Sequence, residues 1–294
     1  MVLLRPSLFV LLAFLHQFIC PCSAVANETT AKHKVTATFV ANEGILIAGS
    51  ETRILIDGIF DKSYGAFQVP NAETLAKLKS AAAPFDRLTA VLTTHGDLDH
   101  INPAFVAQHL INDPSCAFIA TAEAVELVRS LPEYSKFESR VHAIVQDGTE
   151  NETTINKVKI RAIPLGHMPR PPSLPEMPFN VGYLFTVGGI TFFHTGDMSA
   201  ENLPALQSAK LAEAGVDVLL ISWYAFKPND GAQAQAIIQY LNPKLVLLAH
   251  LTTKNAATEK ALVQKISGLP TVIPLDTPLR TYEFEKTGAT VTVK

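Results

Sequence analysis

Residues 93–100, Thr-Thr-His-Gly-Asp-Leu-Asp-His (TTHGDLDH), decide how this sequence is interpreted. Two histidines and two aspartates fall within six residues, directly after the apolar run 88–92. A cluster of this kind is either a metal site or a solvated turn. Imidazole and carboxylate groups together suit divalent first-row metals, but the stretch alone leaves both interpretations open.

Further candidate ligands follow other apolar runs. His167, Asp197 and His250 each come directly after a stretch that is expected to be a strand. Loops at strand ends are where a rigid scaffold presents functional side chains. Taken alone, His167 or His250 would be interpreted as a structural histidine. The recurrence of the pattern in all four segments favours a metal site.

The order of elements predicts an α+β fold. Strands are expected at 39–47, 53–58, up to 92, 116–120, 141–145, 158–163, 181–187, 190–194, 216–222 and 245–249, with two short strands near the end of the chain. Helices are expected at 72–82, 103–111, 121–130, 231–241 and 258–266. Strands alternating with helices, twice over, predict two sheets covered by helices on their outer faces. The proline-rich stretch 168–178 is expected to be a rigid loop within one domain.

The first 26 residues have the features of a secretory signal. Arg5 precedes an apolar run from Leu8 to Cys20, and Ala24-Val25-Ala26 supplies the small residues that a signal peptidase accepts. The run is shorter than the roughly 20 residues that span a bilayer. We therefore expect a signal peptide at 1–26, a single domain at 27–294, and export to the periplasm or the medium without a stable membrane anchor.

Composition narrows the classes of partner. The chain is 48% hydrophobic and 17% charged, with a formal net charge of −3. It can bury a sizeable core, and its charge gives no electrostatic reason to expect nucleic acid. We expect a small-molecule substrate, while the oligomeric state stays open.

The motifs together resemble the metallo-β-lactamase superfamily of hydrolases. The resemblance covers nearly the whole of residues 27–294 and is closest to the stand-alone bacterial hydrolases. The matching segments are 54–58 (ILIDG), 94–100 (THGDLDH), 165–167 (LGH), the block 182–197, and 248–250 (LAH). The resemblance implies a four-layer αββα sandwich with a dinuclear metal site at one edge.

The resemblance also implies roles for seven residues. One metal would be held by His95, Asp97 and His167, the other by Asp99, His100 and His250, with Asp197 bridging the two. A water between the two cations would lose a proton near neutral pH. The resulting hydroxide would attack a carbonyl carbon or phosphorus, and Asp99, as the catalytic residue, would orient it and receive its proton.

Asp97 departs from the usual superfamily motif, HxHxDH. It raises the carboxylates of the predicted centre to three, with Asp99 and Asp197. We expect two divalent ions, zinc first, although the added negative charge moves the preference towards manganese or ferrous iron. Alternatively, the first site is weak or empty and one metal is catalytic.

Four further residues are candidates for substrate binding. By resemblance, the loop with Trp223, Tyr224 and Lys227 borders the pocket; the two rings would stack on or hydrogen-bond a substrate, and Lys227 would pair with an anionic group. Arg170 follows a ligand closely and would reach a phosphate or carboxylate. The alternatives are simple packing for Trp223 and a solvated surface position for Arg170.

The sequence therefore predicts an exported, metal-dependent hydrolase of a small ester, phosphodiester, lactone or amide, with ester-type bonds ranked first. Two alternatives stay open: an iron-dependent oxygenase or redox enzyme of the same fold, and a non-catalytic metal-binding protein.

Overall fold

The computed structural model describes residues 34–170 and 178–294. The predicted signal peptide and most of the proline-rich loop lie outside the described residues. Both of these stay predictions.

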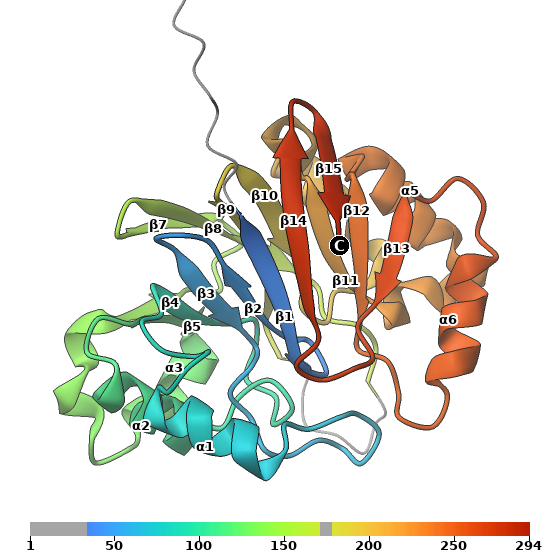
Figure 1. Ribbon diagram of the computed structural model, residues 1–294. Coiled ribbons are helices and arrows are strands. Elements are labelled where there is room, and N and C mark those ends of the chain that lie inside the picture. Colours follow the sequence, from blue (N-terminus) through green and yellow to red (C-terminus); the bar gives the residue numbers. More distant parts are fainter. Residues whose placement is uncertain (1–33, 171–177) are drawn as a thin grey trace, which may run out of the picture. The chain divides into compact units, whose positions relative to one another are not determined.

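Eight strands form the first sheet in the described part of the chain, in the order β15-β14-β1-β2-β3-β4-β5-β6 (Figure 1). They are β1 (Val35–Ala41), β2 (Gly44–Ala48), β3 (Arg53–Ile56), β4 (Ala90–Thr93), β5 (Ala117–Thr121), β6 (Val141–Ile144), β14 (Thr281–Thr287) and β15 (Thr290–Val293). Strands β3 to β6 are parallel neighbours. Parallel pairs need crossover connections, and helices α1 (Ala72–Ser80), α2 (Pro103–Asn112) and α3 (Ala122–Arg129) lie in these connections.

Seven strands of the described residues form the second sheet, in the order β13-β12-β11-β10-β9-β8-β7. They are β7 (Asn151–Ile155), β8 (Val158–Leu165), β9 (Asn180–Val187), β10 (Ile190–His194), β11 (Val218–Ser222), β12 (Leu245–Ala249) and β13 (Thr271–Pro274). Strands β7 to β10 pair antiparallel, and β10 to β13 pair parallel. The connections after β10 carry α4 (Leu203–Ser208), α5 (Ala232–Leu241) and α6 (Ala256–Gln264).

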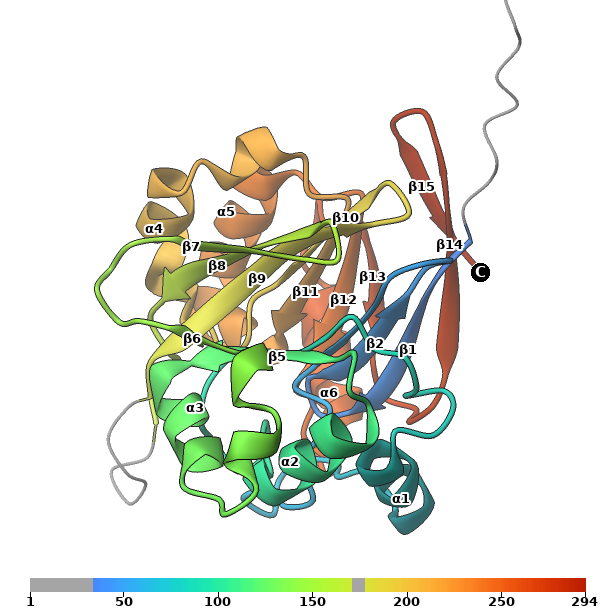
Figure 2. The same cartoon turned by 90° about the vertical axis from the view of Figure 1, so that its left-hand side faces the viewer.

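Three apolar clusters hold four layers together. The central cluster joins the facing sides of the two sheets and includes Phe39, Phe185 and Phe192. The outer face of each sheet packs on its own helices in a separate cluster. Helices α1 to α3 and helices α4 and α5 lie on opposite sides of the sheets (Figure 2). This is the αββα sandwich that the sequence predicted.

Some strand predictions were wrong. The expected single strand at 39–47 is two strands, β1 and β2, because the chain turns at Asn42 with φ 52° and continues antiparallel. Both turn residues, Asn42 and Glu43, are buried, so their polarity did not mark a surface turn. Strand β7 was missed because it alternates half-buried and exposed residues that are mostly polar. Three strands, not two, close the chain.

Strands β4, β8, β10 and β12 place the candidate ligands, since a ligand follows the end of each strand by one to three residues. The first belongs to one sheet and the other three to the second. Among the described residues, no helix is both long and apolar enough to cross a membrane.

The central layer predicts a large effect of Phe192→Ala on stability. The ring of Phe192 is fully buried, with the ring centroids of Phe185 and Phe284 each 5.8 Å away. We expect the free energy of unfolding in urea to fall by about 3–5 kcal/mol, because a cavity replaces the ring. Val145→Ala, at a side chain with 51% exposure, should change it by less than about 0.5 kcal/mol. Equal losses in the two variants would contradict this account of the core.

Candidate metal centre

The structure brings all seven predicted ligands together at one edge of the sandwich. The loop after β4 supplies four of them, and the loops after β8, β10 and β12 supply one each. Six of the seven are buried, and Asp97 is half-buried. Four sets of acidic and imidazole groups lie within metal-binding reach of one another in the described residues, and three of these sets consist of predicted ligands.

The first subsite lies between His95, Asp97 and His167. The Nε2 atoms of His95 and His167 are 3.6 and 3.9 Å from Oδ2 of Asp97. The same two atoms lie 3.9 and 3.6 Å from Oδ2 of Asp197. A tetrahedral ion with bonds of about 2.0–2.1 Å has ligand atoms about 3.3–3.4 Å apart. The four atoms therefore have nearly the spacing of a coordination shell.

The second subsite uses the other oxygen of Asp197. Oδ1 of Asp197 lies 3.6 Å from Nε2 of His100 and 3.2 Å from Nε2 of His250. Nε2 of His250 is in turn 3.9 Å from Oδ2 of Asp99. One carboxylate thus presents one oxygen to each set of imidazoles, which is the arrangement of a bridging ligand.

The unpartnered atoms of the site fit divalent cations. Within the described residues, seven buried atoms of the predicted ligands lack a hydrogen-bond partner: the Nε2 atoms of His95, His100, His167 and His250, the Nδ1 atoms of His100 and His250, and Oδ1 of Asp197. Buried polar atoms are almost always hydrogen-bonded, because leaving them unpaired is costly. Imidazole nitrogens and a carboxylate oxygen that converge in this way fit a metal ion.

The tautomers of two imidazoles also fit. Nδ1 of His167 lies 2.7 Å from the Met168 carbonyl oxygen and must donate to it. The Thr94 hydroxyl donates to Asp57, so its oxygen accepts from Nδ1 of His95, 3.0 Å away. Each Nε2 then carries the lone pair that a metal needs. Burial and repulsion from His95 lower the pKa of His167 to about 4, which keeps its ring neutral.

Asp57 contacts residues of the candidate metal centre without being one of the predicted ligands. Its carboxylate accepts the backbone N–H and the hydroxyl of Thr94 at 2.8 and 2.7 Å, and lies 3.0 Å from Nδ1 of His100. Both Asp57 (φ 44°) and His250 (φ 60°) adopt left-handed backbone conformations. Such strain costs roughly 1–3 kcal/mol per residue and persists where the surrounding structure enforces it.

Charge within the cluster is strongly coupled. Burial would raise the pKa of Asp197, but His250 and His100 hold it well below its usual range. Burial would lower the pKa of His100, but Asp197 and Asp57 raise it well above its usual value. A bound cation would take the place of the proton on such an imidazole.

A pocket of about 510 Å³ opens over the centre. Besides four of the predicted ligands and the bridging Asp197, it is lined by Tyr64, Ala66, Phe67, Met168, Pro169, Arg170, Tyr224 and Lys227. Three of the four proposed substrate-binding residues therefore border it. Trp223 does not; its indole is packed in the apolar cluster under α5.

The side chains of Arg170 and Lys227 both make specific contacts beside the pocket. The Arg170 side chain is only 7% exposed and forms an ion pair with Asp97. The ammonium of Lys227 lies 3.6 Å from the ring centroid of Tyr224 and 4.6 Å from that of Trp223, a cation–π arrangement. The alternative of a solvated surface position for Arg170 was wrong.

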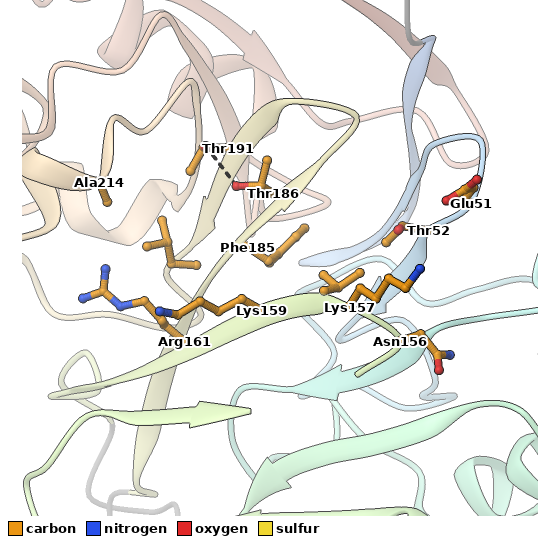
Figure 3. A pocket seen from close by; sticks show the side chains of 12 residues that line it. Glu51, Thr52, Asn156, Lys157, Lys159, Arg161, Phe185, Thr186, Thr191 and Ala214 are labelled. Atoms are coloured by element: carbon orange, nitrogen blue, oxygen red, sulfur yellow. Dashed lines mark hydrogen bonds between the residues drawn. The ribbon is translucent and has the colours of Figure 1, made fainter. Parts of the chain in front are cut away.

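A second pocket, of about 410 Å³, lies away from these ligands (Figure 3). Lys159 and Arg161 in its lining are paired with Glu152 and Glu150. The hydroxyls of Thr186 and Thr191, joined by the dashed line in Figure 3, bond to each other at 3.2 Å. Its lining contains no predicted ligand, so this pocket does not border the candidate metal centre.

Sequence reasoning did not assign roles to Asp57, Asn42, Tyr64 or Phe67. Asn42 donates to Oδ2 of Asp99 at 3.2 Å, and the ring centroid of Phe67 lies 4.1 Å from that of His250. Asp57 had a signal, since it follows an apolar strand as the ligands do. The other three lie in a turn and a loop without any local pattern.

Comparison with known families decides the identity. The family model described as "Beta-lactamase superfamily domain" matches residues 36–250, which is most of the chain. The chain belongs to the metallo-β-lactamase superfamily. A search of curated proteins gives no match.

Solved structures share the metallo-β-lactamase fold at low sequence identity. Igni18, a metallo hydrolase from the archaeon Ignicoccus hospitalis, is 18% identical with a TM-score of 0.59, covering 86% of this chain and 100% of its own. An isothiocyanate hydrolase from Delia radicum gut bacteria is 15% identical with a TM-score of 0.56, covering 85% and 100%. CmlA, a diiron β-hydroxylase from Streptomyces venezuelae, is 15% identical with a TM-score of 0.54, covering 84% and 53%. At these identities the likeness shows the fold alone.

The supporting role of Asp57 predicts the effect of Asp57→Ala on metal binding. Loss of a group that orients metal ligands should lower zinc affinity by about 10- to 100-fold, measured by competition with a chromophoric chelator. Asp113→Ala is the matched control, because Asp113 is also buried and accepts a backbone N–H, that of Leu88, at the opposite end of β4. That variant should lose stability but keep its zinc affinity. Unchanged zinc affinity in Asp57→Ala would remove Asp57 from the centre.

Proposed function

We propose that the protein is an exported, metal-dependent hydrolase of a small substrate with an ester-type bond: an ester, lactone or phosphodiester first, an amide second. The observation that carries the proposal is the division of the Asp197 carboxylate between two sets of imidazoles, directly beneath a pocket that Asp99 also lines. Export is supported only by the predicted signal peptide.

The residues of the centre suit hydrolysis. Bound divalent ions would supply Lewis acidity, which polarises a carbonyl or phosphoryl oxygen and lowers the pKa of water. Asp99 lies at the floor of the pocket with Oδ2 held by the amide of Asn42. From there its carboxylate can orient an attacking water and take its proton.

The pocket wall suits a small substrate with apolar and anionic parts. Burial and the charge of Asp97 raise the pKa of Tyr64 to about 12, and burial and the charge of Glu259 raise that of Tyr224 to about 12. Both phenols therefore stay protonated and can donate to substrate oxygens. Phe67 and Met168 supply apolar contact, and Lys227 supplies a cation at the rim.

An iron-dependent oxygenase is the second candidate. The observation that favours it is the number of carboxylates, since Asp97, Asp99 and Asp197 all reach the centre. Carboxylate ligands suit manganese, and sets of histidines with carboxylates are typical of the ferrous iron of oxygenases. It predicts oxygen consumption by iron-loaded protein with a thiol or persulfide substrate, followed with an oxygen electrode.

Asp99→Asn tests the hydrolase directly. With p-nitrophenyl acetate and bis(p-nitrophenyl) phosphate at saturating zinc, we expect turnover to fall by about 10²- to 10⁴-fold, the usual contribution of a general base. Circular dichroism and zinc content establish that the fold and the ions are retained. Asp147→Asn, at an exposed aspartate, should leave turnover unchanged. Full turnover in Asp99→Asn would refute the assigned role.

Metal removal tests dependence on the ions. Hydrolysis of the same two esters should disappear after dialysis against a chelator and return when zinc, manganese or ferrous iron is added back, because the Lewis acid is then restored. The ion that restores most turnover per bound metal identifies the working cofactor. Hydrolysis that survives complete metal removal would exclude the proposed chemistry. A metal-loaded protein without any hydrolysis would favour the non-catalytic alternative.

A further inference from the structure

Arg170 approaches the first subsite at the residue that departs from the usual motif. Its Nη2 lies 2.8 Å from Oδ2 of Asp97 and donates to the Tyr64 hydroxyl at 3.1 Å. The two charged side chains are only 7% and 14% exposed, so this is a largely buried ion pair. Breaking such a pair by removing one partner is strongly destabilising.

The guanidinium of Arg170 contacts Oδ2 of Asp97, the oxygen that would face the first ion. Oδ2 of Asp97 is the same atom that lies 3.6 Å from Nε2 of His95 and 3.9 Å from Nε2 of His167. An arginine side chain stays protonated in proteins. Arg170 therefore cannot lose its charge when a divalent cation binds beside it, and the carboxylate must lie between two positive charges.

The charges of the pair cancel. The other two ligands of this subsite besides the bridging Asp197 are imidazoles, which bind metals in their neutral form. Asp97 adds one negative charge where a third imidazole would add none, and Arg170 returns one positive charge at hydrogen-bond distance. An aspartate at this distance from a guanidinium forms a charge-assisted pair, so the negative charge that Asp97 adds is offset by the positive charge of Arg170.

We propose that Asp97 and Arg170 act as one functional unit, in which Arg170 is a positioning residue that orients and neutralises an aspartate ligand. The inference rests on the proposed metal centre but goes beyond hydrolysis, because it concerns how the first ion is held. It has a counterintuitive consequence. Restoring histidine at position 97 would weaken the first subsite, since it would leave the buried guanidinium facing a divalent cation.

A double-mutant cycle tests the unit: wild type, Asp97→His, Arg170→Met and Asp97→His/Arg170→Met. Zinc per chain is measured by elemental analysis, and zinc affinity by competition with a chromophoric chelator, so that no readout depends on turnover. We expect Asp97→His to weaken the first zinc by about 10- to 100-fold, the range for groups that support a metal ligand. The double variant should return to within about threefold of wild type, because coupled residues are non-additive.

Controls separate charge from folding. Arg161→Met removes an arginine whose ion pair with Glu150 lies away from the centre, and it should leave zinc affinity unchanged. If Asp97→His does not fold, as judged by thermal unfolding in chelator, Asp97→Asn with and without Arg170→Met repeats the cycle at constant side-chain size. Arg170→Met must then still restore part of the zinc affinity that Asp97→Asn loses, although the amide is a poor ligand, and no recovery would overturn the unit.

The outcomes distinguish this inference from the proposed function. Two zinc ions in wild type with additive effects in the cycle would overturn the Asp97–Arg170 unit and leave the metal centre intact. Two zinc ions in Asp97→His at wild-type affinity would overturn it as well. A wild-type protein that binds no zinc, manganese or iron would overturn the metal centre, and the unit with it.

Discussion

A buried carboxylate shared by two groups of imidazoles is the constraint on which the rest of this structure depends. Asp197 is 3% exposed, and its two oxygens face the Nε2 atoms of different histidines. Convergent polar atoms without partners destabilise a folded protein unless something binds them. The ions that fit here are therefore expected to contribute to folding as well as to chemistry, because ligand binding to the native state stabilises it.

The sandwich is what permits this arrangement. The ligands come from the ends of strands in both sheets, so the apolar cluster between the sheets fixes the distance between the two halves of the centre. The β1–β2 turn reinforces it: Asn42 donates to Asp99 and accepts the backbone N–H of His250 at 3.2 Å. A single turn residue thereby links ligands from the loops after β4 and β12. Left-handed conformations at Asp57 and His250 are tolerated because this network over-determines them.

The sequence predicted well what depends on local pattern. The apolar runs before His95, His167, Asp197 and His250 mark strands, and the residue after a strand end is where a loop presents a ligand, so the ligands and the layer order followed. The sequence-based prediction failed where the conformation depends on contacts between residues that are distant in the chain. Asn42 was expected to continue a strand. In the folded chain it lies in a buried turn, which depends on packing against distant segments and not on a local pattern. The partner of Arg170 and the packing of Trp223 likewise depend on segments that no local pattern connects.

The two cationic side chains that line the pocket, Arg170 and Lys227, differ in their availability to a substrate. Arg170 is already held by Asp97 and Tyr64, so an anion that recruited it would expose the charge on Asp97. Lys227 forms no ion pair with the described residues and rests on the Tyr224 ring, where burial lowers the pKa of its ammonium. An exposed ammonium without a carboxylate partner in the described residues can pair with an anionic ligand group without giving up an existing ion pair. The proposed substrate would thus present its scissile bond to the centre and its negative group to Lys227, while Arg170 would stay paired with Asp97.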